Sequence, residues 1–202
     1  FNWVNKTYNI NKDDRLLFIT SICFDLSVYD IFGTLAAGAR VVIAEKGEVM
    51  DPEILMDIML KEKITFWDSV PSTLNHLVNY LEESGQEFVQ KNLRTVFLSG
   101  DWIPVSLPDK TKKYFPNANV ISLGGATEGT IWSIYYPIKK VGKYQKTIPY
   151  GKPLDNNYFY ILNENKETVP RGVPGELYIG GVGVATGYMN NSKKTNEAFM
   201  KD

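Results

Sequence analysis

Cysteine and histidine are almost absent from this sequence of 202 residues, which contains one of each, Cys23 and His76. A single cysteine excludes an internal disulfide framework, and the two residues are too few for a cysteine–histidine metal cluster. Cys23 stands in an apolar, strand-like stretch, so we expect it to be a small core residue. His76 falls in the middle of a predicted helix and is expected to be a surface or packed residue rather than a base.

Long apolar runs and clusters of basic residues are also missing. No segment approaches the ~20 apolar residues that span a bilayer, and the first residues do not resemble a signal peptide. The net charge is −1 and basic residues do not cluster, so neither nucleic acid nor a membrane is an expected partner. A cytoplasmic setting is therefore predicted. Because the chain starts at Phe1 and stops abruptly at Asp202, we also expect a piece of a longer polypeptide.

Strand and helix patterns alternate over residues 1–137. Apolar, β-branched runs predict buried strands, and periodic apolar residues between them predict helices. Repeated strand–helix–strand units predict an α/β fold, with a mostly parallel sheet flanked by helices. The predicted strands cover 15–20, 39–44, 64–67, 93–98, 119–123 and 130–136, and the predicted helices cover 24–35, 51–63, 71–83 and 105–114, the last interrupted by Pro108. In the first helix, helical spacing predicts one shared buried face for Val28, Ile31, Phe32 and Leu35.

The pattern changes after Pro137. Two strand-like runs, 158–162 and 176–180, are separated by proline- and glycine-rich turns, which is typical of antiparallel hairpins. A polar helix is expected over 191–200. We therefore predict two parts, an α/β subdomain over 1–137 and a small antiparallel β subdomain over 138–202.

The segment 122–133 carries the clearest chemical signal. Gly124 and Gly125 let a ligand approach the backbone and offer bare N–H groups to phosphate. Thr127 adds a hydroxyl donor, and Glu128 adds the kind of oxygen ligand that Mg²⁺ prefers. The combination favours a nucleoside triphosphate. An ordinary turn between two strands is the alternative.

Topology predicts which residues accompany this segment. In parallel sheets, ligands bind outside the carboxyl ends of the strands. Asp25, Ser99 and Thr127 each follow such a strand end, so we expect them near one cleft. For Asp25, the alternative is a helix N-cap.

Three motifs occur in order along the chain. They are Phe-Asp-Leu-Ser-Val-Tyr-Asp-Ile-Phe over 24–32, Leu-Gly-Gly-Ala-Thr-Glu over 123–128, and the unbroken run from Gly175 to Met189. Together they resemble the adenylation domains of nonribosomal peptide synthetases, within the adenylate-forming ligase superfamily, and the resemblance covers nearly the whole chain. It implies that 1–137 forms the α/β subdomain of the adenylation core. It also implies that 138–202 forms a partial barrel, truncated at its C-terminal end.

The resemblance further implies an activity and partners. In this family an amino acid carboxylate attacks the α-phosphate of ATP, with Mg²⁺, and gives aminoacyl-AMP and pyrophosphate. The aminoacyl group then passes to the phosphopantetheine thiol of a carrier domain. Peptidyl carrier and condensation domains of a megasynthase are therefore the implied partners.

Roles for single residues follow from the same resemblance. It implies that Asp25 holds the substrate α-ammonium, that Thr127 contacts phosphate, and that Glu128 helps to hold Mg²⁺; Thr127 and Glu128 are the implied catalytic pair. Family members usually carry an aromatic residue that stacks on adenine where this chain has Gly124, so stacking must come from elsewhere or be weaker. The residues implied around the nucleotide are Gly100, Asp101, Ser122, Gly124, Gly125, Ala126 and Thr127.

The amino acid pocket is interpreted by matching positions to the family. Tyr29, Phe97 and Trp132 leave limited room, and Asp68 offers an acceptor to a thiol or hydroxyl. Asp68 and Phe97 depart from the pattern of cysteine-activating domains, which the other residues match. Cysteine is the first choice, serine the second, and glycine or alanine the third; simple core packing is the alternative for the aromatic residues. The residues at the specificity positions are Asp25, Leu26, Tyr29, Asp68, Phe97, Ser99, Leu123, Ile131 and Trp132.

Two rival functions stay open. An acyl- or aryl-CoA ligase shares the fold but needs no acid at position 25 to meet an ammonium. A degenerate module kept as a scaffold is the non-catalytic alternative, against which the intact Thr127 and Glu128 speak. The family's phosphate loop would precede Phe1, and its ribose-binding aspartate and catalytic lysine would follow Asp202. Residues 1–202 alone are therefore expected to be inactive.

Overall fold

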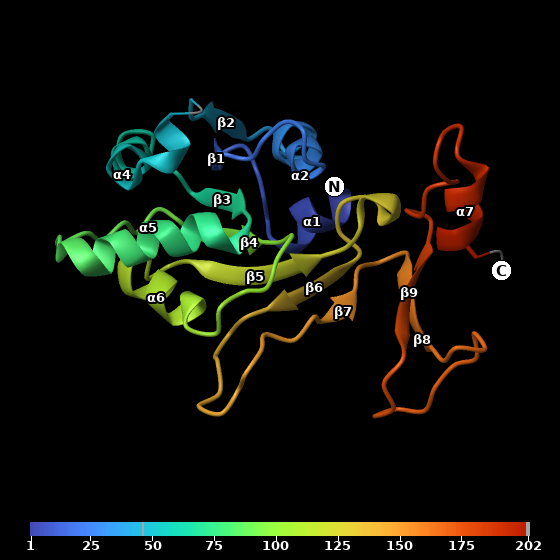
Figure 1. Cartoon of the computed structure of the whole chain (residues 1–202). Helices are drawn as coiled ribbons and strands as arrows, with labels where there is room; N and C mark the ends of the chain where they lie inside the picture. The colour runs from blue at the N-terminus through green and yellow to red at the C-terminus, as the bar shows by residue number, and fades with distance from the viewer. Residues whose placement is uncertain (46, 201–202) are drawn as a thin grey trace.

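A large, mostly parallel sheet with helices on both faces dominates the computed structural model, which describes residues 1–45 and 47–200 (Figure 1). Its seven strands lie in the order β2-β1-β3-β4-β5-β6-β7. The first five are parallel; β6 pairs antiparallel with β5, and β7 pairs antiparallel with β6 at the edge of the sheet. This confirms the predicted fold class. The strands are β1 (Arg15–Phe18), β2 (Arg40–Ile43), β3 (Phe66–Ser69), β4 (Thr95–Leu98), β5 (Asn119–Gly124), β6 (Ile134–Pro137) and β7 (Lys152–Pro153).

Successive strand residues point to opposite faces of the sheet, and each face has its own core. On one face, Trp67 and Val96 pack with apolar residues of α4, α5 and α6; on the other, Phe66 and Phe97 pack with residues of α1 and the α2–η1 segment. Because both faces are covered, the strands are continuous apolar runs. The helical segments of this layer are α1 (Asn2–Thr7), α2 (Leu26–Val28), the π-helical turn η1 (Tyr29–Gly33), α3 (Thr34–Ala36), the 3₁₀ turn η2 (Glu48–Met50), α4 (Pro52–Lys61), α5 (Pro71–Ser84) and α6 (Leu107–Tyr114).

The helical segment predicted over 24–35 forms, but the prediction of its buried face is wrong. Leu26 and Tyr29 point into the core instead. The prediction assumed 3.6 residues per turn, whereas the π-helical turn adds a residue and rotates the helix face that meets the sheet. The ring of Tyr29 then packs directly on Gly33, where a Cβ would lie 2.4 Å from Cδ2 of the ring. The residues predicted to be buried are exposed or half-buried: Val28, Ile31, Phe32 and Leu35.

Two smaller expectations are also wrong. Cys23 is exposed, because it lies in the loop between β1 and α2 rather than in the strand. Pro108 does not interrupt a helix, because α6 begins at Leu107 and the proline occupies its first turn. A proline is tolerated there, since the first N–H groups of a helix have no intrahelical partner.

After β6 the chain returns to the large sheet before it builds a small one. Ile138 and Ile148 join the core beneath α5 and α6, and β7 pairs with β6. The predicted antiparallel pair then forms from β8 (Asn157–Leu162) and β9 (Glu176–Gly181), followed by α7 (Ser192–Ala198). The division at residue 137 stays a prediction, and residues 201–202 of its second part lie outside the described residues.

None of the helices in the described residues is both long enough and apolar enough to cross a membrane.

Candidate functional site

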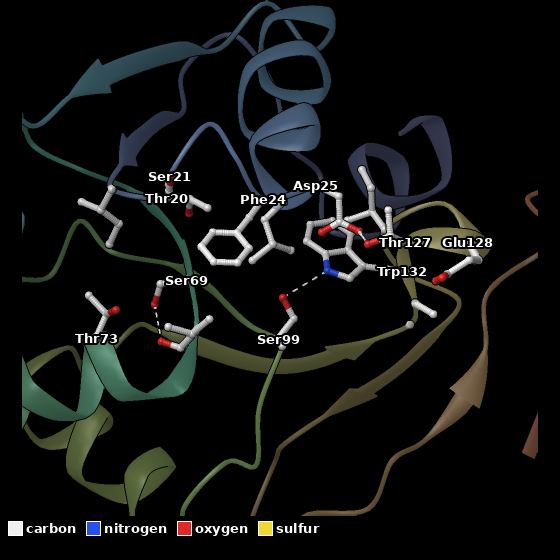
Figure 2. Close-up of a pocket in the computed structure, with 17 residues that line it drawn as sticks. Thr20, Ser21, Phe24, Asp25, Ser69, Thr73, Ser99, Thr127, Glu128 and Trp132 are labelled. Atoms are coloured by element: carbon white, nitrogen blue, oxygen red, sulfur yellow. Dashed lines mark hydrogen bonds between the residues drawn. The ribbon is translucent and has the colours of Figure 1, made fainter. Parts of the chain in front are cut away.

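A cavity of about 450 Å³ opens at the carboxyl ends of the parallel strands (Figure 2). Asp25 and Thr127, which are 102 positions apart, meet in it: the Thr127 hydroxyl donates a hydrogen bond to Oδ2 of Asp25 at 2.7 Å. Asp25 occupies the N-cap position of α2, but its side chain accepts no capping hydrogen bond there. Within the described residues, Oδ1 of Asp25 receives no hydrogen bond, and the Asp25 side chain lines this cavity.

The loop after β5 is tightly folded and presents two functional side chains. A Cβ on Gly125 would lie 2.6 Å from the carbonyl oxygen of Ile131, so only glycine fits where the loop doubles back. Thr130 and Ile131 take left-handed φ angles of 66° and 64°. The strand predicted over 130–136 therefore starts only at Ile134. The 3₁₀ turn η3 (Thr127–Gly129) lies in the longer loop between β5 and β6, and its first two side chains line the cavity.

Aromatic side chains close the inner end of this cavity. The Trp132 indole N–H donates to Oγ of Ser99 at 3.2 Å, and both residues line the wall (Figure 2). Behind Trp132, the ring centroids of Tyr29 and Phe97 lie 4.8 Å and 5.6 Å from its own. Both supporting rings are fully buried. Since closely packed aromatic rings do not move aside easily, this end of the cavity admits only a small group.

Glu128 lines the same cavity and is held by the third sequence motif. The Tyr188 hydroxyl donates to Oε1 of Glu128, and the Ala185 N–H donates to the Glu128 carbonyl oxygen at 2.7 Å. The hydrogen bond from Tyr188 keeps the pKa of the Glu128 carboxyl below its usual value. An ionised carboxylate suits Mg²⁺, which takes one or two carboxylates together with phosphate oxygens and water. The described residues contain no group of three or more side chains that would cage a metal, so phosphate and water would complete the shell.

A second cavity, of about 660 Å³, adjoins the first and shares Gly100 and Gly125 with it. Two aromatic residues, Trp102 and Tyr150, stand in its wall. The two spaces can therefore take different parts of one extended ligand. The second wall also contains residues that the family resemblance implies around a nucleotide: Gly100, Asp101, Ser122, Gly124 and Gly125.

Comparison with known proteins agrees with this geometry. The family described as AMP-binding enzyme matches residues 1–189. The chain belongs to this family. Bacitracin synthase 1 of Bacillus licheniformis is 50% identical over 198 residues, which are 98% of this chain and 4% of that protein. Pyochelin synthetase PchF of Pseudomonas aeruginosa is 41% identical over 198 residues, which are 98% of this chain and 11% of that protein.

Solved structures identify the same kind of AMP-binding enzyme. The nonribosomal peptide synthetase FmoA3 superimposes with a TM-score of 0.93 at 36% identity, over 98% of this chain and 21% of that one. A form of FmoA3 bound to AMPPNP and a form bound to α-methyl-L-serine-AMP match with TM-scores of 0.93 and 0.92 at 35% identity. The chain is thus part of a nonribosomal peptide synthetase adenylation domain, and it spans a small fraction of each relative.

Every residue implied around the nucleotide lines one of the two cavities of this adenylation domain. Of the residues implied around the amino acid substrate, some line the first cavity and others do not. Leu123 lines the second cavity, not the first. Tyr29 and Phe97 stand behind Trp132, and Asp68 is fully buried and lines neither wall. The implied amino acid residues that do line the first cavity are Asp25, Leu26, Ser99, Ile131 and Trp132.

Several wall residues were missed from the sequence. Ser69 and Val70 line the first cavity; Ser69 is the last residue of β3, and Val70 follows it as Ser99 follows β4. The topological rule that selected Ser99 would have found them. Tyr150 had no such signal, because the return of the chain to the large sheet at β7 has no sequence signature.

Asp68 faces a second buried carboxyl group, that of Asp30. Asp68 is 0% exposed and Asp30 is 1% exposed, and no described residue donates a hydrogen bond to either carboxyl group. Burial raises the pKa of both groups, and for Asp68 the nearby charge of Asp30 raises it further. A protonated carboxyl can donate to its neighbour, so we infer that the pair holds a proton at a pH where free aspartate has lost it.

We expect the Asp68→Asn variant to be more stable than the wild type at neutral pH. A folded-state pKa above the unfolded value means that the free energy of unfolding falls as pH rises from about 4 to about 7. Asparagine removes one of the two carboxyl groups, so the fall in the free energy of unfolding over this pH range should be smaller by about 1 kcal/mol or more. Melting temperatures measured across that pH range check the prediction, with the exposed Asp57→Asn as matched control. Parallel curves for the variant and the wild type would contradict it.

Proposed function

We propose that the intact protein containing this chain forms aminoacyl-AMP from a small amino acid and ATP, with release of pyrophosphate. The proposal rests above all on the hydrogen bond between Thr127 and Asp25, which joins the expected phosphate contact to the expected ammonium acceptor. One carbon separates the amino and carboxylate groups of an α-amino acid. An ammonium held at Oδ1 of Asp25 therefore leaves the carboxylate beside a phosphate at Thr127, which is the positioning that this reaction needs.

ATP and Mg²⁺ are the proposed co-substrate and metal. Thr127 would turn its single hydroxyl proton from Asp25 to a phosphate oxygen. The carboxylate of Glu128 would bind the metal, which neutralises phosphate charge when bound. The depressed pKa of Glu128 keeps this ligand ionised at neutral pH. A form of the similar FmoA3 carries AMPPNP, which supports a nucleoside triphosphate here.

Cysteine is the proposed substrate, serine the next choice, and glycine or alanine the third. Trp132, backed by two buried rings, limits the side chain to a few atoms. Asp68 does not reach the wall, so we assign the contact with a thiol or hydroxyl to Oγ of Ser99. One form of FmoA3 holds α-methyl-L-serine-AMP, an adenylate with a small polar side chain, and this supports the size class.

A panel of amino acids in a pyrophosphate exchange assay on the intact protein tests this function. We expect exchange with cysteine to exceed that with 3-mercaptopropionate, its analogue without the amine, by about 30-fold or more in kcat/KM. The loss of a charged partner leaves the Asp25 carboxylate unpaired, which costs roughly 2–5 kcal/mol. Comparable rates for both compounds would favour the acyl- or aryl-CoA ligase. No exchange and no ATP binding would favour the scaffold.

The partners of the whole protein are part of the same proposal. Peptidyl carrier and condensation domains are proposed, with a phosphopantetheine thiol as the acceptor of the aminoacyl group, because the similar bacitracin and pyochelin synthetases are far longer than this chain. The cytoplasmic setting and the inactivity of residues 1–202 alone stay predictions. Activity is therefore measured on the intact protein.

A further inference from the structure

Two aromatic side chains in the second cavity have no role in the scheme above. Trp102 is 76% exposed and Tyr150 is 49% exposed, so much of each ring system is open to a ligand. Aromatic surface inside a cavity favours a flat, unsaturated partner, because rings attract one another beyond the effect of buried area.

The ring of Tyr150 occupies the space that a side chain at position 124 would need. A Cβ on Gly124 would lie 2.4 Å from Cε2 and 2.9 Å from Cζ of Tyr150. Glycine at 124 and tyrosine at 150 are therefore a matched pair, since any larger residue at 124 would displace the ring. Burial raises the pKa of the Tyr150 hydroxyl, so the ring is neutral at physiological pH.

The backbone on both sides of Tyr150 is fixed. Ile148 is buried in the core under α5 and α6. Gly151 has a φ of 119°, and a Cβ there would lie 2.0 Å from the carbonyl oxygen of Tyr135 in β6, so the chain packs flat against that strand. A ring held in this way loses little conformational entropy when a ligand stacks on it.

The charges in the second cavity suit a neutral base better than a phosphate. Among the described residues of its wall, Asp101 alone carries a charge at neutral pH. Its carboxylate repels phosphate but accepts a hydrogen bond from an exocyclic amine. Because the cavity shares Gly100 and Gly125 with the first one, a nucleotide with its phosphates at Thr127 can place its base here.

We propose that Tyr150, with Trp102 in the same wall, provides the aromatic surface on which the purine base of the nucleotide stacks. This inference rests on the proposed use of ATP and adds two residues to the nucleotide site. Stacking on one ring typically contributes about 5- to 100-fold in affinity, so its loss should be measurable in a single variant.

Ligand binding by the intact protein tests the proposal. Calorimetry with ATP–Mg²⁺ should show about 5- to 100-fold weaker binding for Tyr150→Ala and a change within about 2-fold for Tyr150→Phe, because a phenyl ring also stacks. Tripolyphosphate–Mg²⁺ has no base, so Tyr150→Ala should bind it as tightly as the wild type does. Tyr144→Ala, which removes an 86% exposed ring outside the cavity, is the matched control and should change neither affinity.

Two further variants keep the proposal testable if Tyr150→Ala does not fold. Trp102→Ala changes an exposed side chain and should also weaken ATP binding selectively. Gly124→Ala should weaken ATP binding as a single variant but add little to Tyr150→Ala, because the clash with the ring is then gone and only the 3.0 Å approach to Cγ2 of Ile134 remains. Unchanged ATP affinity in Tyr150→Ala and Trp102→Ala, or equal losses for ATP and tripolyphosphate, would overturn the proposal.

The outcomes also separate this inference from the proposed function. If the wild type binds ATP but shows no exchange with any amino acid, the function fails while the affinities of the variants still decide the role of Tyr150. If the wild type binds no ATP, both fail.

Discussion

Asp25→Asn is expected to lower kcat/KM for the amino acid by about 30-fold or more while the affinity for ATP–Mg²⁺ stays within about 3-fold. Asparagine keeps the shape and an oxygen that accepts from Thr127, but it removes the charge that faces the substrate ammonium. A charge-assisted hydrogen bond in a partly desolvated site contributes roughly 2–5 kcal/mol, and each 1.4 kcal/mol is about a factor of ten. Initial-rate exchange with varied cysteine and saturating ATP measures the effect.

The amine-free analogue supplies the control for this variant. If Asp25 acts on the ammonium, Asp25→Asn should leave the weak exchange with 3-mercaptopropionate unchanged, so the preference for cysteine over the analogue should nearly vanish. An equal fall for both compounds would show that Asp25 acts elsewhere, for example by holding Thr127 in place. Thr127→Val breaks the hydrogen bond and keeps the carboxylate. Because it also removes the expected phosphate contact, exchange with both compounds should fall, while the preference for cysteine should stay if Asp25 acts on the ammonium.

The sheet and the main cavity were predictable because they depend on signals that the sequence carries locally. Buried parallel strands are continuous apolar runs, and their carboxyl ends meet at one edge. That rule alone places Asp25, Ser99 and Thr127 together, and in the structure all three line the first cavity. The chemistry of Thr127 and Glu128 needs only residue types and short spacing.

Contacts that depend on exact helix register were not predictable. The π-helical turn at Tyr29–Gly33 adds a residue that no periodicity reveals, so the apolar spacing of Val28, Phe32 and Leu35 indicated the wrong face. Asp68 was placed in the pocket by matching positions, but on β3 its side chain packs against Asp30. Tyr150 reaches Gly124 only because β7 returns to the sheet beside β6.

Glu128→Gln is expected to lower kcat by about 100- to 1000-fold and to raise the Mg²⁺ concentration needed for half-maximal exchange. Glutamine keeps the length of the side chain and can still accept from Tyr188, but it loses the charge that a hard cation requires. Removing one preorganised electrostatic contact at a reacting centre commonly costs that much. Exchange rates at several Mg²⁺ concentrations, with saturating cysteine and ATP, measure both effects.

Tyr188→Phe separates the charge of Glu128 from its positioning. The hydrogen bond from Tyr188 lowers the pKa of Glu128, so its removal should move that pKa back toward the usual value. A carboxylate with a depressed pKa loses its charge only in more acidic solution. The acid limb of the exchange rate should therefore move to higher pH in Tyr188→Phe, while the rate at pH 8 stays within about 10-fold of the wild type.

A Glu128→Gln enzyme with wild-type rate and wild-type Mg²⁺ requirement would contradict metal binding by this residue. A pH profile unchanged in Tyr188→Phe would leave Glu128 as a ligand whose charge does not depend on the third motif.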